Sequence, residues 1–161
     1  IDPKPRLFII GGVHLSQALS SLANICEYEV IIIDPREYFA NKERFPNDLI
    51  ISEWPDVALN NYNFNFSDNI VTLTHDPKID DLALKIALNS TAGDIGSLGS
   101  RKTHASRIER LKGEGYSLED INRIHAPIGL NISSKTPQEI ALSIMAEITQ
   151  VRRNFWKIIR S

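Results

Sequence analysis

Residues 6–19 read RLFIIGGVHLSQAL and contain the turn that decides the fold. Four apolar residues, Leu7–Ile10, predict a buried strand, two glycines follow it, and an apolar helix comes next. The dinucleotide-binding pattern G-x-G-x-x-G needs glycines at positions 11, 13 and 16, but this chain has Gly11, Val13 and Ser16. The stretch therefore predicts the first strand–turn–helix unit of a Rossmann-like fold. It leaves open whether the turn binds phosphate or is a tight turn without a ligand.

The rest of the chain alternates short apolar runs with segments of helical spacing. Further strands are expected at Val30–Ile33, Leu49–Ile51, Ile70–Leu73 and Asp94–Leu98, and helices at Ser16–Cys26, Asp80–Leu88, Lys102–Lys112 and after Thr136. Strands that are apolar nearly throughout are typical of a parallel sheet covered on both faces. We therefore predict an α/β fold, a Rossmann-like three-layer sandwich with a mostly parallel sheet.

The totals suit one ordinary domain over residues 1–161, with a linker-like N-terminus at 1–6 and a C-terminal tail at 154–161. The formal net charge of -2 argues against a nucleic-acid partner and a membrane surface. No apolar run reaches the roughly 18 residues that a membrane span needs. The single cysteine, Cys26, cannot form an internal disulfide, so we expect a cytoplasmic protein. Two prolines before Arg6 suggest that more chain precedes this domain.

Polar residues and glycines follow the predicted strands directly. They are Gly11, Gly12 and His14, then Asp34 and Arg36, then Thr74, His75 and Asp76, and finally Gly99, Ser100, Arg101 and His104. In open parallel sheets, ligands bind beyond the carboxyl ends of the strands, where the strand order reverses. We therefore expect these residues to line one cofactor-binding site, with three of the four histidines on its rim.

Two parts of this rim have a specific chemical interpretation. Asp34 follows Gly11 at the spacing of the acid that accepts the ribose hydroxyls of NAD, and Arg36 could receive a phosphate ester. Alternatively, Asp34 caps a loop and Arg36 pairs with a surface acid. The stretch Ser100–Lys102 starts a helix with cations that oppose the helix dipole, so an anion bound there would relieve a local cost. The alternative is a solvated basic helix start.

The histidines are also candidates for metal ligands or catalytic groups. The spacing of His14, His75 and Asp76 matches no known metal pattern, so no metal site is expected. For His104 the alternative is a half-buried, hydrogen-bonded side chain, and His125 is expected to be structural. No serine or cysteine nucleophile paired with a base is recognisable, so no catalytic residue is assigned and the protein is not expected to be an enzyme.

A set of segments between Arg6 and Arg153 is distinctive as a whole: GGVHLSQAL, IIIDPREYFANKERFP, EWPDVAL, VTLTHDPKIDDLAL, IGSLGSRKTHASRIERL, RIHAPIGLNI and TPQEIALSIMAEI. In order and spacing they resemble the C-terminal Rossmann domain of the XdhC/CoxI family. THDPK and GSRKTH are the specific segments, whereas the glycine turn alone would not be. Val13 and Asn131 depart from the family pattern, which commonly has a small residue and an aspartate there.

The resemblance implies an accessory or maturation factor for xanthine dehydrogenase or a related molybdenum hydroxylase. Such factors bind the molybdenum cofactor (molybdopterin), protect it through sulfuration and deliver it to the apoenzyme. The partners it implies are the hydroxylase apoenzyme, a cysteine desulfurase and a second copy in a homodimer. The residues in matching motifs are His14, Asp34, Arg36, His75, Asp76, Arg101 and His104. Full-length members also carry an N-terminal domain with a cysteine motif, which Cys26 does not replace.

Two alternatives of other classes remain open. One is an NAD(P)-binding oxidoreductase domain that uses Asp34 for the ribose, against which Val13 argues. The other is a ligand-free interaction module that contacts its partners through the basic and aromatic end RRNFWKIIRS. Titration with NAD and NADP separates the first alternative from a cofactor chaperone, and removal of the tail tests the second.

Overall fold

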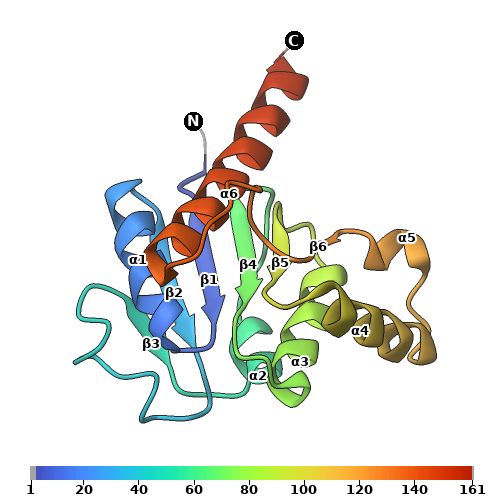
Figure 1. The fold of residues 1–161 in the computed structure, drawn as a ribbon, viewed down its shortest axis with the longest axis horizontal. Coiled ribbons are helices and arrows are strands. Elements are labelled where there is room, and N and C mark those ends of the chain that lie inside the picture. The colour runs from blue at the N-terminus through green and yellow to red at the C-terminus, as the bar shows by residue number, and fades with distance from the viewer. Residues whose placement is uncertain (1–2, 161) are drawn as a thin grey trace.

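A computed structural model of the protein describes residues 3–160, and in these residues a six-stranded sheet forms the centre of the molecule (Figure 1). The strands are β1 (Arg6–Ile10), β2 (Glu29–Ile33), β3 (Leu49–Ile51), β4 (Asp68–Thr72), β5 (Ile95–Ser97) and β6 (Ile124–His125). Their order is β3-β2-β1-β4-β5-β6 and every pairing is parallel. This is the doubly wound Rossmann order, so the predicted fold class is confirmed.

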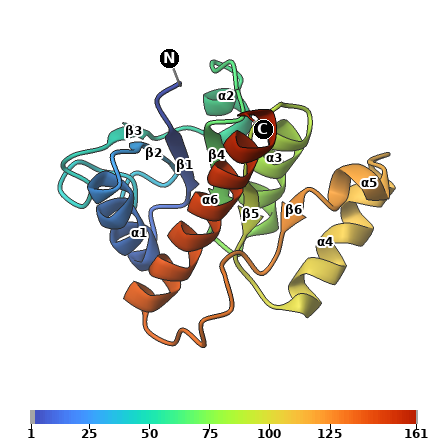
Figure 2. The same ribbon diagram turned by 90° about the horizontal axis from the view of Figure 1, so that it is seen from above.

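Helices cover both faces of the sheet. They are α1 (His14–Ile25), α2 (Pro55–Leu59), α3 (Pro77–Leu88), α4 (Arg101–Gly113), α5 (Leu118–Ile121) and α6 (Pro137–Arg160). Figure 2 shows α1 and α6 side by side over one face, with α2 and α3 on the other. The predicted three-layer arrangement is therefore confirmed.

The strand residues divide between the two faces with the period of two that a pleated strand imposes. In β1, Leu7 and Ile9 belong to the core under α1 and α6, whereas Phe8 and Ile10 belong to the core under α3. All four side chains are fully buried. An uninterrupted apolar run is what a strand buried on both faces requires, and this explains why these strands could be recognised from the sequence.

Several boundaries differ from the expectations. The strand β4 starts at Asp68 rather than Ile70, because the buried Asp68 carboxylate is paired with Arg6 of the neighbouring strand at 2.7 Å. The helix α2 and the two-residue strand β6 were not expected. Cys26 was expected on the apolar stripe of a helix, and this was wrong: it lies just past the end of α1 and is exposed.

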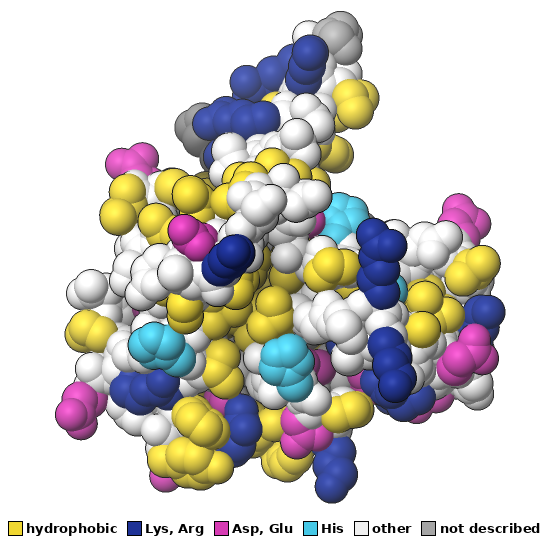
Figure 3. Space-filling view, in the orientation of Figure 1, with side chains coloured by type: hydrophobic (Ala, Val, Ile, Leu, Met, Phe, Trp, Pro, Cys, Tyr) yellow, Lys and Arg dark blue, Asp and Glu magenta, His cyan; other side chains and the backbone are white. Residues whose placement is uncertain are grey.

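The expected C-terminal tail continues α6 as far as Arg160. Phe155 stacks on Phe66 with ring centroids 4.1 Å apart, and the helix projects beyond the sheet (Figure 1). Figure 3 shows lysine and arginine side chains gathered on this projecting part, which carries Arg152, Arg153, Lys157 and Arg160. Within residues 3–160, no helix is both long enough and apolar enough to cross a membrane. Residues 1–2 of the expected linker and Ser161 of the expected tail lie outside the described residues.

Candidate functional site

The carboxyl ends of β1, β2 and β4 meet at one edge of the sheet, where the strand order reverses between β1 and β4. A Cβ atom added to Gly11 would lie 2.6 Å from Cγ2 of Thr74, so the first and third predicted segments are in contact. The Gly12 N–H donates to Oδ2 of Asp34 at 2.9 Å, which joins the second segment to the first. Three of the four predicted segments are thus brought together.

The fourth segment, 99–104, follows β5 at the same edge and lies beside β4. The Leu98 N–H donates to the Thr72 carbonyl at 2.9 Å, and the Thr72 hydroxyl donates to Oγ of Ser97 at 2.7 Å. Among the predicted site residues, His14, His75, Ser100 and Arg101 are exposed, Arg36, Thr74, Asp76, Gly99 and His104 are half-buried, and Gly11, Gly12 and Asp34 are buried. The topology places all of them at one edge; their binding role stays a prediction.

Asp34 is fully buried, and its carboxylate is occupied by protein donors. Oδ1 accepts from the backbone N–H and Nε of Arg36 at 3.0 and 2.9 Å, and Oδ2 accepts from Gly12 N and Nη2 of Arg36, each at 2.9 Å. The hydrogen bond to Asp34 raises the pKa of Arg36. Arg36 was expected to bind a phosphate ester or pair with a surface acid, but it pairs with Asp34 itself. A ribose could reach this carboxylate only by displacing the guanidinium.

The loop that follows β2 packs directly on the glycine turn. A Cβ atom added to Gly12 would lie 2.6 Å from the carbonyl oxygen of Phe39. Arg44 secures this contact, because its Nη1 donates both to the Gly12 carbonyl and, at 2.8 Å, to the Phe39 carbonyl. Gly12 is therefore needed for close packing of protein on protein, next to position 13, where the second glycine of a dinucleotide-binding turn approaches the pyrophosphate.

The N–H groups of the turn are also used inside the protein. Gly11 donates to the Ile33 carbonyl at 2.8 Å, and Val13 donates to Oγ of Ser16 at 3.2 Å. Together with the bond from Gly12 to Asp34, this occupies the donors of residues 11–13. The turn is therefore tight and its donors are used within the protein, while the binding of a phosphate there stays a prediction.

Asp80 in α3 organises the segment that follows β4, and it was not predicted from the sequence. Its carboxylate accepts from the Thr74 hydroxyl at 2.6 Å and from the His75 N–H at 3.1 Å. His75 has a φ of 66°, so these bonds hold a backbone conformation that L-residues rarely adopt. Burial raises the pKa of Asp80 to about 6, although the hydrogen bonds from Thr74 and His75 act in the opposite direction.

Arg107 in α4 is a second residue that was not predicted from the sequence. It is 3% exposed, and within the part of the chain that the structure describes, its Nε has no hydrogen-bond partner. Its Nη1 lies 3.1 Å from Nδ1 of His104, so His104 is half-buried and hydrogen-bonded, as the alternative for this residue had it. Burial lowers the pKa of both side chains, and the charge of Arg107 lowers that of His104 further. The sequence did contain a signal for the burial of Arg107, because this residue lies four positions before the apolar Leu111 and so shares its helix face.

The start of α4 borders a hollow of about 380 Å³. The hollow is lined by Leu98, Arg101, the loop 127–134, Ile140 and Ser143. Ser100 caps the helix, because its hydroxyl accepts from the Thr103 N–H at 3.1 Å. Gly99 has a φ of 132°, and a side chain there would meet Cγ2 of Thr103 at 3.2 Å. The backbone N–H groups of this helix start, the exposed Arg101 and the adjoining hollow form a surface suited to an anionic ligand.

The family model described as the XdhC Rossmann domain matches residues 7–148. The chain belongs to this family. It is 33% identical over 153 residues to the uncharacterized protein YqeB of Escherichia coli K12, a match that covers 94% of the chain and 28% of that protein. It is also 32% identical over 154 residues to a probable xanthine dehydrogenase subunit from Bacillus subtilis 168, covering 95% of the chain and 44% of that protein.

Two further relatives carry informative descriptions. The molybdenum cofactor insertion chaperone PaoD of Escherichia coli K12 is 29% identical over 150 residues, covering 93% of the chain and 41% of PaoD. The crystal structure of a xanthine dehydrogenase from Bacillus halodurans matches with a TM-score of 0.79 at 28% identity, covering 95% of the chain and 44% of that one. The chain thus spans less than half the length of each of these four proteins. Two of these names mention xanthine dehydrogenase, and the name of PaoD mentions insertion of the molybdenum cofactor.

Proposed function

We propose that this XdhC domain helps to insert the molybdenum cofactor into a molybdenum hydroxylase, and that it binds the phosphate-bearing end of molybdopterin at the start of α4. The proposal rests on one observation: the N-terminus of α4, the cationic side chain of Arg101 and a hollow lie next to one another. Ser100 caps α4, Arg101 is exposed beside it, and a hollow of about 380 Å³ adjoins the helix start. A phosphate at a helix N-terminus is stabilised by backbone N–H groups and by the helix dipole.

The glycine turn offers a poorer fit to the same phosphate. Its N–H groups at residues 11–13 already donate to protein acceptors, and the backbone of Phe39 packs against Gly12. At the start of α4 the Thr103 N–H also has a protein acceptor, the Ser100 hydroxyl, but Ser100 and Arg101 are both exposed. Within the predicted rim, the geometry therefore favours Ser100 and Arg101 as the anion-binding residues over the glycines of the first turn.

The remaining residues of the proposal bind and orient the pterin rather than transform it. The hollow is also lined by the loop 127–134, whose peptide groups and Asn131 side chain suit the polar edges of a pterin. His75 and Asp76 lie at the same sheet edge, at the end of β4. Molybdopterin itself supplies the dithiolene that holds molybdenum. Sulfuration with a cysteine desulfurase, transfer to the hydroxylase apoenzyme and homodimer formation belong to this proposal.

The NAD(P) alternative receives less support from the geometry. The acid that would accept ribose hydroxyls, Asp34, is buried and saturated by Arg36 and Gly12. Displacing the Arg36 guanidinium, whose side chain is 28% exposed, would break charged hydrogen bonds that contribute about 1.5–3 kcal/mol each, and a dinucleotide would have to offset this from its own contacts. A pure interaction module predicts that no small molecule binds at all.

The experiment is a titration of the purified chain with molybdopterin released from a molybdenum enzyme, followed by quenching of tryptophan fluorescence. We expect Arg101→Gln to weaken binding about 10-fold or more, because a hydrogen bond to a charged group contributes about 1.5–3 kcal/mol. Lys112→Gln, an exposed cation at the other end of α4, is the matched control and should leave binding unchanged. Equal binding by wild type and Arg101→Gln would refute the assignment, and tighter binding of NAD or NADP than of molybdopterin would favour the oxidoreductase alternative.

A further inference from the structure

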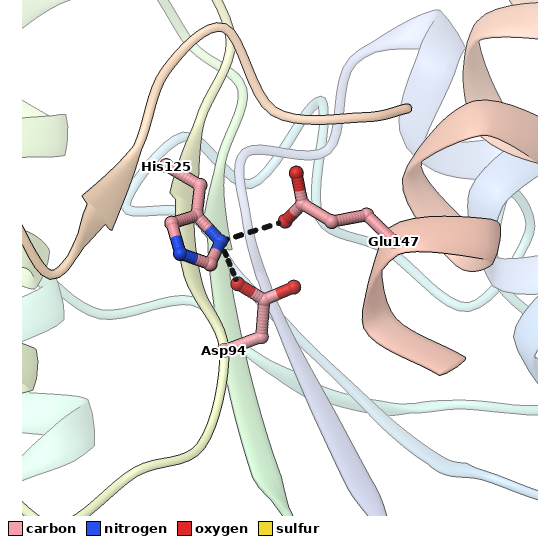
Figure 4. Close-up of side chains that lie close together, drawn as sticks. All are labelled: Asp94, His125 and Glu147. Atoms are coloured by element: carbon pink, nitrogen blue, oxygen red, sulfur yellow. Dashed lines mark hydrogen bonds and ion pairs between the residues drawn. The ribbon is translucent and has the colours of Figure 1, made fainter. Parts of the chain in front are cut away.

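Three side chains from distant parts of the chain converge on the face of the sheet that α6 covers (Figure 4). Asp94 directly precedes β5, His125 ends β6, and Glu147 lies in α6. Nδ1 of His125 lies 2.8 Å from Oδ1 of Asp94 and 3.1 Å from Oε2 of Glu147. One ligand atom from each of the three residues lies within 4.8 Å of the other two.

The fold holds these side chains in place from behind. β5 and β6 pair in parallel, with Ile95 opposite Ile124 and Gly96 opposite His125. Ile95 and Ile124 are buried in the core on the α3 face, so their neighbours Asp94 and His125 point to the α6 face. Oε1 of Glu147 accepts the Gly129 N–H at 3.0 Å, which leaves Oε2 directed at the other two residues.

The cluster leaves a buried carboxylate without hydrogen bonds of good geometry. Asp94 is 0% exposed; its Oδ1 is ion-paired with Nδ1 of His125 at 2.8 Å, but within residues 3–160 neither carboxylate oxygen makes a hydrogen bond of good geometry. Figure 4 shows its carboxylate directed into the space between His125 and Glu147. A buried carboxylate is costly unless it is paired and hydrogen-bonded or coordinates a metal. His125 has a single Nδ1 for two carboxylates, so the imidazole cannot satisfy both of them fully.

We propose that Asp94, His125 and Glu147 form a binding site for one divalent transition-metal ion of the Zn²⁺ or Mn²⁺ type. The ion would be bound by a carboxylate oxygen of Asp94, Nδ1 of His125 and Oε2 of Glu147. In the free protein Nδ1 of His125 holds a proton between the two carboxylates, and binding of the metal releases this proton to solvent. Two carboxylates and the resulting neutral imidazole then balance the charge of a divalent cation. Zn²⁺ accepts histidine nitrogen and carboxylate oxygen together, whereas Mg²⁺ and Ca²⁺ prefer oxygen ligands alone.

Two features of the surroundings agree with a metal site. The Gly129 N–H bound to Glu147 is the kind of outer-shell hydrogen bond that orients a ligating carboxylate. The side chain of His125 is 43% exposed, so an ion can enter from solution and a water molecule can complete its coordination. Because the three ligands come from the start of β5, from β6 and from α6, a bound ion would fix α6 to this edge of the sheet. The site lies at the start of β5, whereas the anion site proposed above lies at its end; the loop 127–134 borders both, through the Gly129 N–H on one side and the hollow on the other.

The test is calorimetric titration of the chelator-treated chain with ZnCl₂ and with MnCl₂, and MgCl₂ serves as the hard-cation control. We expect Zn²⁺ or Mn²⁺ to bind with one site per chain that Mg²⁺ does not fill, and to raise the melting temperature. Glu147→Gln keeps an oxygen for the Gly129 N–H but removes the charge, and Asp94→Asn does the same for the buried carboxylate. Each should weaken binding at least 10-fold, since even outer-shell partners contribute about 10–100-fold. Glu109→Gln, at an exposed carboxylate of α4, should leave it unchanged.

Circular dichroism establishes that each variant is folded before titration, and if Asp94→Asn does not fold, Glu147→Gln decides. Wild-type protein that binds neither Zn²⁺ nor Mn²⁺ would overturn the proposal. Binding of equal strength in wild type, Glu147→Gln and Glu109→Gln would also overturn it, since the ion would then be held elsewhere, for example by exposed histidines. The readout needs no molybdopterin, so its failure is independent of the proposed function.

Discussion

Because the pKa of Asp80 is raised, we expect the free energy of unfolding to depend on pH by an amount that follows from this shift. Asp80 is 1% exposed, and burial raises its pKa from the ordinary 3.8 to about 6. Between these two values the unfolded chain has released the proton while the folded protein still holds it. The folded state therefore binds more protons, and the free energy of unfolding decreases as the pH rises through this window. Below pH 3.8 both states are protonated, and above about pH 6 both are ionised.

The size of the effect follows from the displacement of the pKa. One pKa unit corresponds to about 1.4 kcal/mol, so the change from 3.8 to about 6 gives about 3 kcal/mol. Asp80→Asn imitates the protonated carboxyl group. Its amide oxygen can accept the His75 N–H, and its amide group can donate to the Thr74 hydroxyl, which also receives the Asp76 N–H at 3.0 Å. The variant should therefore keep the contacts and lose the pH dependence of this one group.

The assay is urea unfolding of wild type and Asp80→Asn, followed by circular dichroism at a series of pH values from about 3.5 to 7.5. Titration of the other groups is common to both proteins and cancels in the difference between them. We expect the stability of Asp80→Asn relative to wild type to increase by about 3 kcal/mol between about pH 4 and 6.5 and then to stay constant. A difference that does not change with pH, or one that decreases across this window, would show that the buried carboxylate is not held protonated.

Two further predictions concern packing. Gly12→Ala should destabilise the fold by about 1–3 kcal/mol in thermal melts, because the added Cβ would lie 2.6 Å from the Phe39 carbonyl oxygen. The control Gly113→Ala should be neutral or stabilising by up to about 1 kcal/mol, because no atom lies within 4 Å of its added Cβ. Equal effects of the two substitutions would contradict the close packing of the turn. Phe155→Ala removes the stack on Phe66, whose ring centroid lies 4.1 Å away. The free energy of unfolding should fall by about 0.5–1.5 kcal/mol in addition to the loss from reduced apolar burial, and proteolysis at the end of α6 should be faster. Unchanged cleavage would mean that the stack does not hold this helix.

The part of the fold that the sequence predicts is the part determined by burial. Strands such as β1 and β2 are apolar almost throughout because helices cover both faces, and their runs are visible without any structure. The elements that were missed lack such a pattern. The strand β6 has two residues and is defined by its pairing with β5, and α2 has five residues, which is too short for helical periodicity. Their existence depends on neighbours that are distant in the sequence.

The candidate site was predictable in its location and not in its internal contacts. Residues after strand ends gather at one edge because all the strands are parallel, and this rule places His14, His75 and Arg101 without knowledge of any contact. The partners of buried charges follow no such rule. From the sequence, the Asp34 carboxylate could have bound a ligand or a neighbouring guanidinium. Only the structure shows that it pairs with Arg36. Asp94 and Glu147 lie far apart in the chain, and nothing in their local sequence points to His125.

The closed glycine turn bears on where a ligand can bind in this version of the fold. In a dinucleotide-binding domain, the N–H groups of the first turn and the acid after β2 are left open for pyrophosphate and ribose. Here both are occupied, because Asp34 accepts from Gly12 and Arg44 holds the loop after β2 against the turn. Opening this position would expose a buried carboxylate and break its charged hydrogen bonds, each contributing about 1.5–3 kcal/mol. The start of α4 requires no such rearrangement. A ligand of this domain should therefore contact the β5–α4 side of the rim first. Among the rim residues, substitution of Arg101 should weaken ligand binding most.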